Sequence, residues 1–335
     1  MGEQLLKFKW HIIVVISLLC LGSIVYGISQ QATSVTTEKI IIQVKPGMAA
    51  RDIGELLYKQ GIIKNVFAFQ IVSKIQGLQN SLQAGEYVIN KNMTLQQIVA
   101  MLAKGETTYQ LITIPEGYTV EQIANVLQEK KIGSAAVFKK IAQNFLPYAY
   151  MKNQNSNVVY QTEGYLFPNT YQIAKGATEE QMLNMMTAQF DKQFNDSMRK
   201  RAAELELSIQ KVVILASLVE KEAQLPEDQP IIAGVFLNRL RLDMPLQSCA
   251  TIQYILGYPK AELTVKDTEM PSPYNTYLHP GLPPGPIANP GIAAIQAVLY
   301  PQKTEFLYFV ADKQGAHHFS KTYEEHLIAI EQVNR

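Results

Sequence analysis

An apolar run extends from Val212 to Val219, interrupted only by Ser217, and it ends abruptly in the charged residues Glu220, Lys221 and Glu222. A run of this length and polarity indicates a buried element, and prolines close it off a few residues later. Its content of Leu, Ala, Glu and Lys favours a helix over a strand. The pattern therefore predicts a buried helix that carries a carboxyl group one step beyond its apolar stretch.

Helical spacing places Glu220 on one face with Ser217, while Glu222 points about 160° away. A carboxyl group there can face a partly desolvated cleft, where its pKa would rise and it could donate a proton. The alternative interpretation is that both glutamates simply form the solvated end of a helix.

Residues 12–28 form an uncharged apolar segment, and Lys7 and Lys9 precede it. We expect an uncleaved transmembrane anchor at 12–28, because no small-residue cleavage site follows it. The lysines place residues 1–11 in the cytoplasm by the positive-inside rule. After a polar linker at 29–38, the body of the chain is expected on the other side of the membrane. The expected localisation is therefore a single-pass protein of the cell (inner) membrane.

Apolar periodicity and turn residues predict a small α+β module over residues 39–105. Its expected elements are a strand at 39–44, helices at 49–60 and 65–75, a strand at 84–89 and a helix at 94–102.

A larger α+β domain is predicted over residues 106–335. It begins with a strand at 110–114 and a helix at 119–129. A capping box at Thr178 opens a long helix whose buried stripe continues to Met198. Asn289 is expected to cap a helix that runs to residue 300, with Pro290 at its first position. A β-hairpin over 306–319 and a closing helix from Thr322 complete the domain.

Composition narrows the classes of function. The formal net charge is +1, and a nucleic-acid-binding protein would show a strongly basic patch. The two cysteines, Cys20 and Cys249, are not expected to pair, because Cys20 lies inside the apolar segment. His317, His318 and His326 do not follow a metal-ligand spacing. We therefore expect no nucleic-acid partner, no metal and no cofactor.

Two loops combine aromatic, hydroxyl and amide side chains, EGYLFPNTY at 163–171 and SPYNTY at 272–277. Flat rings can stack on sugar faces while Asn, Thr and Tyr hydrogen-bond the substituents, so such loops are typical of sugar-binding sites.

Several blocks occur in a fixed order: LVEKE at 218–222, FLNRL at 236–240, MPLQS at 244–248, SPYNTY, GLPPGPIANPG at 281–291 and YFVADKQGAHHFSKTYEEH at 308–326. Together with TIPEGYT at 113–119, this series closely resembles the YceG-like family of membrane-anchored endolytic murein transglycosylases. Residues 39–105 loosely resemble LysM-like modules, which bind amino-sugar polysaccharides.

The resemblance implies cleavage of the β-1,4 bond between N-acetylmuramic acid and N-acetylglucosamine in nascent peptidoglycan strands, which leaves 1,6-anhydro ends and terminates strand elongation. It implies that Glu220 is the catalytic residue, and it suggests peptidoglycan synthases as partners. Residues expected to line the substrate cleft are Ser217, Asn238, Arg239, Gln247, Ser248, Tyr254, Tyr274, Asn275 and Tyr277.

One position departs from the family pattern. After Gln247 and Ser248 the family usually has an acidic residue, whereas this chain has Cys249. Two other functions remain open from the sequence. One is a non-catalytic glycan-binding scaffold, which would not need an acid at the end of a buried helix, and the other is a hydrolytic muramidase, which would need a second carboxylate.

Overall fold

The structure of the chain is a computed structural model that describes residues 39–260 and 262–333. The chain divides into two compact units, with the boundary between Gln110 and Leu111. The predicted anchor at 12–28 and linker at 29–38 lie outside the described residues. Among those that are described, no helix is long and apolar enough to cross a membrane.

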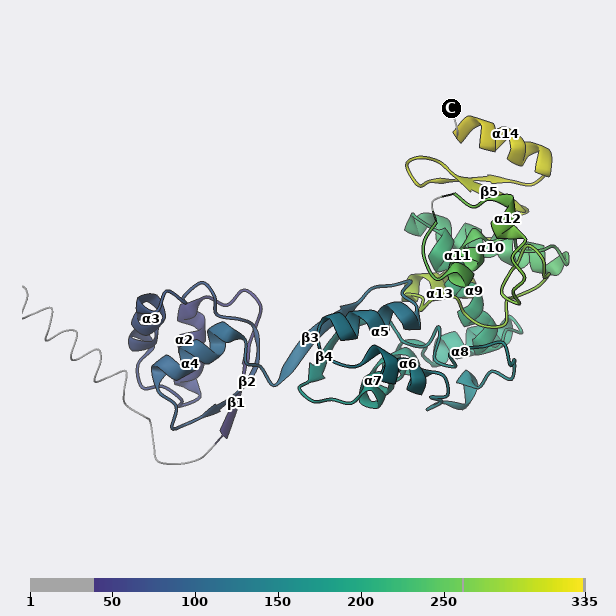
Figure 1. Ribbon diagram of the computed structural model, residues 1–335. Coiled ribbons are helices and arrows are strands. Elements are labelled where there is room, and N and C mark those ends of the chain that lie inside the picture. The colour runs from purple at the N-terminus through teal and green to yellow at the C-terminus, as the bar shows by residue number, and fades with distance from the viewer. Residues whose placement is uncertain (1–38, 261, 334–335) are drawn as a thin grey trace, which may run out of the picture. The chain divides into compact units, whose positions relative to one another are not determined.

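The first unit is a two-stranded antiparallel sheet packed against three helices (Figure 1). Strand β1 (Lys39–Val44) pairs with β2 (Gly85–Asn90), and Ile42 lies opposite Tyr87 on the buried face. Between the strands run α2 (Ala50–Lys59) and α3 (Val66–Ile75), and α4 (Leu95–Lys104) follows β2.

Local capping explains where two of these helices begin. The Asn65 side chain accepts from the backbone N–H groups at the start of α3, and Thr94 forms a capping box with Gln97 at the start of α4. Each element predicted for residues 39–105 is confirmed to within two residues at either end.

The first layer of the second unit joins a two-stranded sheet to three helices that share one core. Strand β3 (Tyr109–Ile114), which begins at the end of the first unit, pairs with β4 (Asn169–Ala174). Around them lie α5 (Val120–Glu129), α6 (Ala135–Ala142) and α7 (Glu179–Gln193).

Helix α9 (Ile209–Glu222) forms the centre of the other core of this unit, with every residue from Val212 to Val219 buried. Elements that pack directly on α9 include α8 (Asp196–Glu204), α10 (Gln229–Arg241), α11 (Cys249–Leu256), α13 (Ile292–Leu299) and the short η1 (Ala149–Met151). The short helix η2 (Pro226–Asp228) precedes α10, and the short helix α12 (Val265–Thr268) follows α11.

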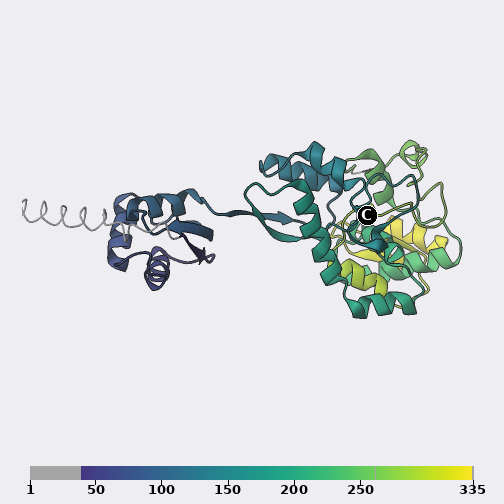
Figure 2. The same cartoon turned by 90° about the horizontal axis from the view of Figure 1, so that it is seen from below.

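The chain ends in a predicted β-hairpin and helix, which the structure confirms. Strand β5 (Tyr308–Ala311) pairs with β6 (His317–Ser320), and α14 (Tyr323–Val333) packs on both strands. The hairpin joins the core through Phe309, whose ring meets Phe236 of α10 edge to face at 5.9 Å. In Figure 1 these elements lie at the top of the second unit, and Figure 2 views the molecule from below.

The long helix predicted from Thr178 onward is wrong in one respect, because the structure divides it into α7 and α8. Phe194 leaves helical geometry with ψ 69°, and the Asn195 side chain then accepts from Met198 N at 3.1 Å to cap α8. Phe194 and Met198 are both buried. The apolar stripe therefore continues across the break, which is why periodicity alone did not reveal it.

Asn195→Ala is expected to lower the free energy of unfolding by about 1 kcal/mol, because the cap of α8 is lost. Asn195→Asp retains a capping oxygen and should stay near the wild type. Urea denaturation followed by circular dichroism measures both changes. Equal midpoints for the Ala variant and the wild type would contradict this role of Asn195.

Candidate active site

Glu220 lies in the last turn of α9, where the helix emerges from the core. The Ser208 side chain caps the other end of α9 by accepting from Lys211 N at 3.2 Å. The helix stops at Glu222 because Ala223 adopts an extended conformation. A buried, tightly packed helix thus holds the Glu220 backbone in a fixed position, as the apolar run predicted.

The Glu220 carboxyl group is half-buried, and its Oε2 atom accepts a hydrogen bond from Gly291 N at 3.0 Å. Burial raises the pKa of Glu220, and the nearby negative charge of Glu116 adds to this effect. The Gly291 N–H and the positive charge of Lys221 act in the opposite direction, and the net pKa is raised. A carboxyl group in this state can hold a proton and release it to a base or a leaving group.

Two glycines border the carboxyl group. Gly117 has a φ of +74°, and a Cβ atom there would lie 3.5 Å from the Cγ atom of Glu220. A Cβ atom on Gly291 would lie 1.9 Å from Oε1 of Glu116. The absence of side chains at these positions leaves room for both carboxylates.

Glu116 is therefore a second carboxylate next to Glu220, and it was not among the candidate residues predicted from the sequence. It is exposed in the turn between β3 and α5, and no hydrogen bond to it is found among the described residues. A signal was present, because Glu116 belongs to the TIPEGYT block that carries part of the family resemblance.

Glu222 contacts a different part of the fold, consistent with its predicted direction away from Glu220. It accepts hydrogen bonds from the Ser248 hydroxyl and, at 3.4 Å, from Ala250 N. Burial raises the pKa of Glu222, while these hydrogen bonds and the charges of His317 and Arg239 oppose the rise. Ser248, predicted to line the cleft, is thus a partner of Glu222.

Ser217 fastens the proline-rich loop at 281–291 to α9. Its hydroxyl group donates to Ile214 O at 2.7 Å and accepts from Ile287 N at 3.1 Å. The same loop reaches Glu220 four residues later through Gly291.

Asn289 has a different role from the predicted helix cap. Helix α13 begins at Ile292 with Gly291 as its N-cap. The Asn289 side chain instead accepts from Leu166 N at 2.7 Å and donates to Tyr118 O and to Glu163. Long-range hydrogen bonds therefore prevail over the local capping signal.

Two candidate residues on α10, Asn238 and Arg239, are buried and bind backbone carbonyl groups. Asn238 donates to Thr304 O at 2.8 Å, and Arg239 donates to Leu307 O at 2.6 Å and Leu246 O at 2.8 Å. They hold the segment before β5 on α10, and their contact with substrate stays a prediction.

The structure brings Gln247, Ser248 and Tyr277 together at the start of α11. Gln247 N donates to Thr276 O at 3.1 Å, and the Tyr277 hydroxyl lies 3.1 Å from Cys249 Sγ. Ser248 and Tyr277 adjoin Glu222, and the role of all three residues in binding also remains a prediction.

Tyr254 and Tyr274 form a second group. Their ring centroids are 5.1 Å apart, and the Tyr254 hydroxyl donates to Glu163 Oε2 at 3.4 Å. Asn275 is fully buried, and its amide donates to Thr268 O and Met270 O at 2.9 Å each. Asn275 therefore shapes the 272–277 loop from within.

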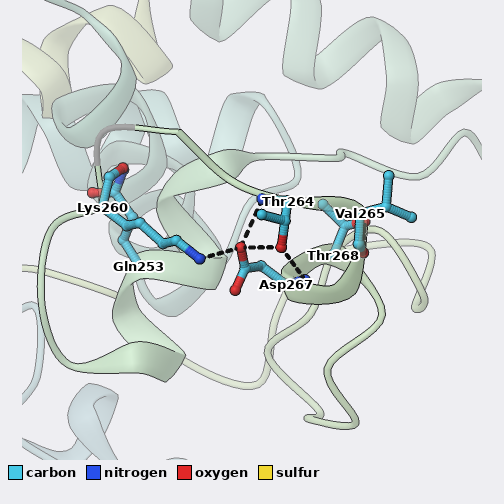
Figure 3. A network of polar contacts seen from close by, with 6 residues as sticks. All are labelled: Gln253, Lys260, Thr264, Val265, Asp267 and Thr268. Atoms are coloured by element: carbon cyan, nitrogen blue, oxygen red, sulfur yellow. Dashed lines mark hydrogen bonds and ion pairs between the residues drawn. The ribbon is translucent and has the colours of Figure 1, made fainter.

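A network of polar contacts stabilises α12 (Figure 3). Asn275 also binds this helix, by donating to Thr268 O. Asp267 Oδ2 accepts from Lys260 Nζ at 2.5 Å and from the Thr264 backbone N–H at 2.6 Å. These hydrogen bonds lower the pKa of Asp267 to about 2. Within residues 39–260 and 262–333, no group of three or more His, Cys, Asp or Glu side chains is placed to hold a metal ion.

Residues 42–332 match the YceG-like family. A Bacillus subtilis protein named endolytic murein transglycosylase is 35% identical over 321 residues, which cover 91% of this chain and 88% of that protein. A Streptococcus pneumoniae serotype 2 protein of the same name is 34% identical over 86% of this chain and 57% of its own length. The crystal structure of a putative yceG-like protein from Listeria monocytogenes, 34% identical, covers 88% of this chain with a TM-score of 0.61.

Glu116→Gln is expected to lower the pKa of Glu220, because it removes a negative charge that disfavours ionisation of its neighbour. Carbon-13 NMR titration of the side-chain carboxyl groups measures this pKa, with Glu220→Gln identifying the signal. Glu129→Gln, at the other end of α5, is the control and should leave it unchanged. An unaltered Glu220 titration in the Glu116 variant would show that the two carboxylates do not interact.

Proposed function

The chain belongs to the YceG-like family, and we propose that it is an endolytic murein transglycosylase in which Glu220 is the catalytic acid and base. The observation that carries this proposal is the state of the Glu220 carboxyl group. It is half-buried at the end of a rigid helix, its pKa is raised, and a single backbone N–H holds it in place.

One carboxyl group can perform both halves of the reaction. Protonated Glu220 donates to the glycosidic oxygen that leaves C1 of N-acetylmuramic acid, and the C1–O bond breaks. The C6 hydroxyl group of the same sugar closes on C1 to form the O6–C1 bond, and its proton returns to the Glu220 carboxylate. The product ends in 1,6-anhydro-N-acetylmuramic acid, and the enzyme regains its starting state.

Intramolecular attack explains why no second carboxylate is required for this reaction. Glycoside hydrolysis uses one carboxyl group as the acid and another as base or nucleophile. A hydroxyl group on the reacting sugar has an effective molarity far above that of an external nucleophile once it is correctly oriented. Its oxygen needs only to lose a proton, which Glu220 accepts.

The position of Glu116 favours hydrolysis as a second candidate reaction. Glu116 is exposed, close enough to raise the pKa of Glu220, and free of hydrogen-bond partners among the described residues. A carboxylate in that state could act as the second carboxyl group that a muramidase requires. The end group of the product, 1,6-anhydro in one case and reducing in the other, separates the two reactions.

The N-terminal segment and the first unit support a proposal for where in the cell the enzyme acts. The apolar residues 12–28 and the preceding lysines support a single-pass membrane anchor with a cytoplasmic N-terminus. Such a tether would restrict cleavage to nascent strands near the membrane, where peptidoglycan synthases work. The β–α–α–β order of residues 39–90 supports a LysM-like module that binds glycan.

Glu220→Gln is expected to reduce the rate of glycan cleavage by about 10²- to 10⁴-fold, because it removes the proton donor. The measurement is mass spectrometry of muropeptides after incubating residues 39–335 with purified and with uncrosslinked nascent peptidoglycan. Anhydro products should appear with the wild type and with the control Glu227→Gln, which changes an exposed residue beyond α9.

Other outcomes would identify the alternatives. Reducing-end products that disappear in Glu116→Gln would establish hydrolysis with Glu116 as the second carboxylate. Full glycan binding without cleavage by the wild type on either substrate would support the non-catalytic scaffold.

A further inference from the structure

Glu163 is a buried carboxyl group that the cleavage mechanism above does not use. It is 2% exposed and belongs to the loop that precedes β4. Its Oε1 atom accepts from Val120 N at 3.1 Å and from Asn289 Nδ2 at 3.1 Å, and its Oε2 atom accepts from the Tyr254 hydroxyl at 3.4 Å. Burial raises the pKa of Glu163 to about 8. One side chain thus joins α5, α11 and the proline-rich loop.

Asn289 connects Glu163 to the turn before α5 through hydrogen bonds to both. Its backbone N–H and its Nδ2 group both donate to Tyr118 O, at 2.9 and 2.8 Å, and its carbonyl oxygen accepts from Gly117 N at 2.9 Å. Its Oδ1 atom accepts from Leu166 N at 2.7 Å. Every polar group of Asn289 is therefore occupied, and the residue has one well-defined orientation.

The segments that Asn289 joins are those that border Glu220. Gly117 packs against the Glu220 side chain from one segment, and Gly291, two residues beyond Asn289, donates its N–H to Glu220 Oε2 from the other. A displacement of the loop would move this donor away from the carboxyl group. Small displacements of positioning groups can reduce turnover substantially.

We propose that Glu163, acting through Asn289, is a positioning residue that holds the Gly291 N–H against the carboxyl group of Glu220. This inference rests on the proposed function only in its prediction for catalysis. The arrangement of Gly291 itself can be tested whether or not Glu220 is the acid.

Three substitutions separate positioning from simple stabilisation of α5. In Glu163→Gln, the amide oxygen can accept from both Val120 N and Asn289 Nδ2, and the amide nitrogen can donate to Tyr254. Glu163→Ala leaves those buried donors unpaired. Glu163→Asp keeps a carboxyl group but shortens it by one methylene group, so that it cannot maintain both contacts.

The test measures amide hydrogen exchange and pH-dependent turnover of the full-length protein. In Glu163→Ala, the Gly291 amide should exchange about tenfold faster or more relative to the Leu215 amide in the middle of α9. Turnover should fall about 10- to 100-fold with little change in KM. Glu163→Gln should match the wild type in both measurements.

The pH profile gives a readout that loss of stability would not move. The Gly291 N–H lowers the pKa of Glu220, so its loss should shift the alkaline fall in activity to higher pH in Glu163→Ala. The other groups that face Glu220, Glu116 and Lys221, are unchanged in every variant. Glu163 itself faces Glu121, Tyr254, Tyr160 and Tyr274. Its own titration is lost in the Gln control as well as in the Ala variant.

The proposal is overturned if Glu163→Ala unfolds at lower temperature but retains the Gly291 exchange rate and the pH profile of the wild type. If the Ala variant does not fold, Glu163→Asp is subject to the same criteria. Full activity of Glu220→Gln would instead refute the proposed function. In that case, faster Gly291 exchange in Glu163→Ala, with wild-type exchange in Glu163→Gln, would still support the positioning role.

Discussion

Removing a carboxyl group from water is unfavourable unless its polar atoms are compensated, and three glutamates around α9 meet this constraint to different degrees. Glu163 receives hydrogen bonds from three groups, and Glu222 receives two together with the effect of nearby positive charges. Glu220 has one N–H donor, from Gly291, and a repulsive neighbour in Glu116. It also remains partly open to solvent. Glu220 is therefore the least compensated of the three, and it is the one whose proton can be exchanged with a substrate.

The proline-rich loop at 281–291 determines how the Glu220 carboxyl group is compensated, because it runs along α9 from Ser217 to Glu220. Ser217 fixes it at Ile287, and Gly291 supplies the single donor to Glu220. The prolines restrict the backbone of this loop. The polar groups of Asn289 are all hydrogen-bonded to residues distant in the sequence. A rigid helix and a rigid loop thus define the geometry of the acid from both sides, which is the requirement for a preorganised site.

Features with a local signal could be predicted from the sequence, including the buried helix α9 and the capping box at Thr178. The break before Asn195 could not, because the apolar stripe crosses it. Contacts between distant segments had no periodic signal, so Glu116 and Glu163 were missed as neighbours of the site. Both stand in a Glu-Gly-Tyr triplet, at 116–118 and 163–165. In each triplet the glycine has a positive φ and packs against α9.

Cys249 stands where the family resemblance led us to expect an acidic residue. Its thiol lies beside the Tyr277 hydroxyl at the start of α11. Burial raises the pKa of this thiol, and the negative charge of Glu222 adds to the rise. An acidic residue at this position would place a second negative charge near Glu222, which a neutral thiol avoids. The charges that act on Glu220 come from Glu116 and Lys221. The thiol therefore belongs to the surroundings of Glu222 and is not among the groups that set the pKa of Glu220.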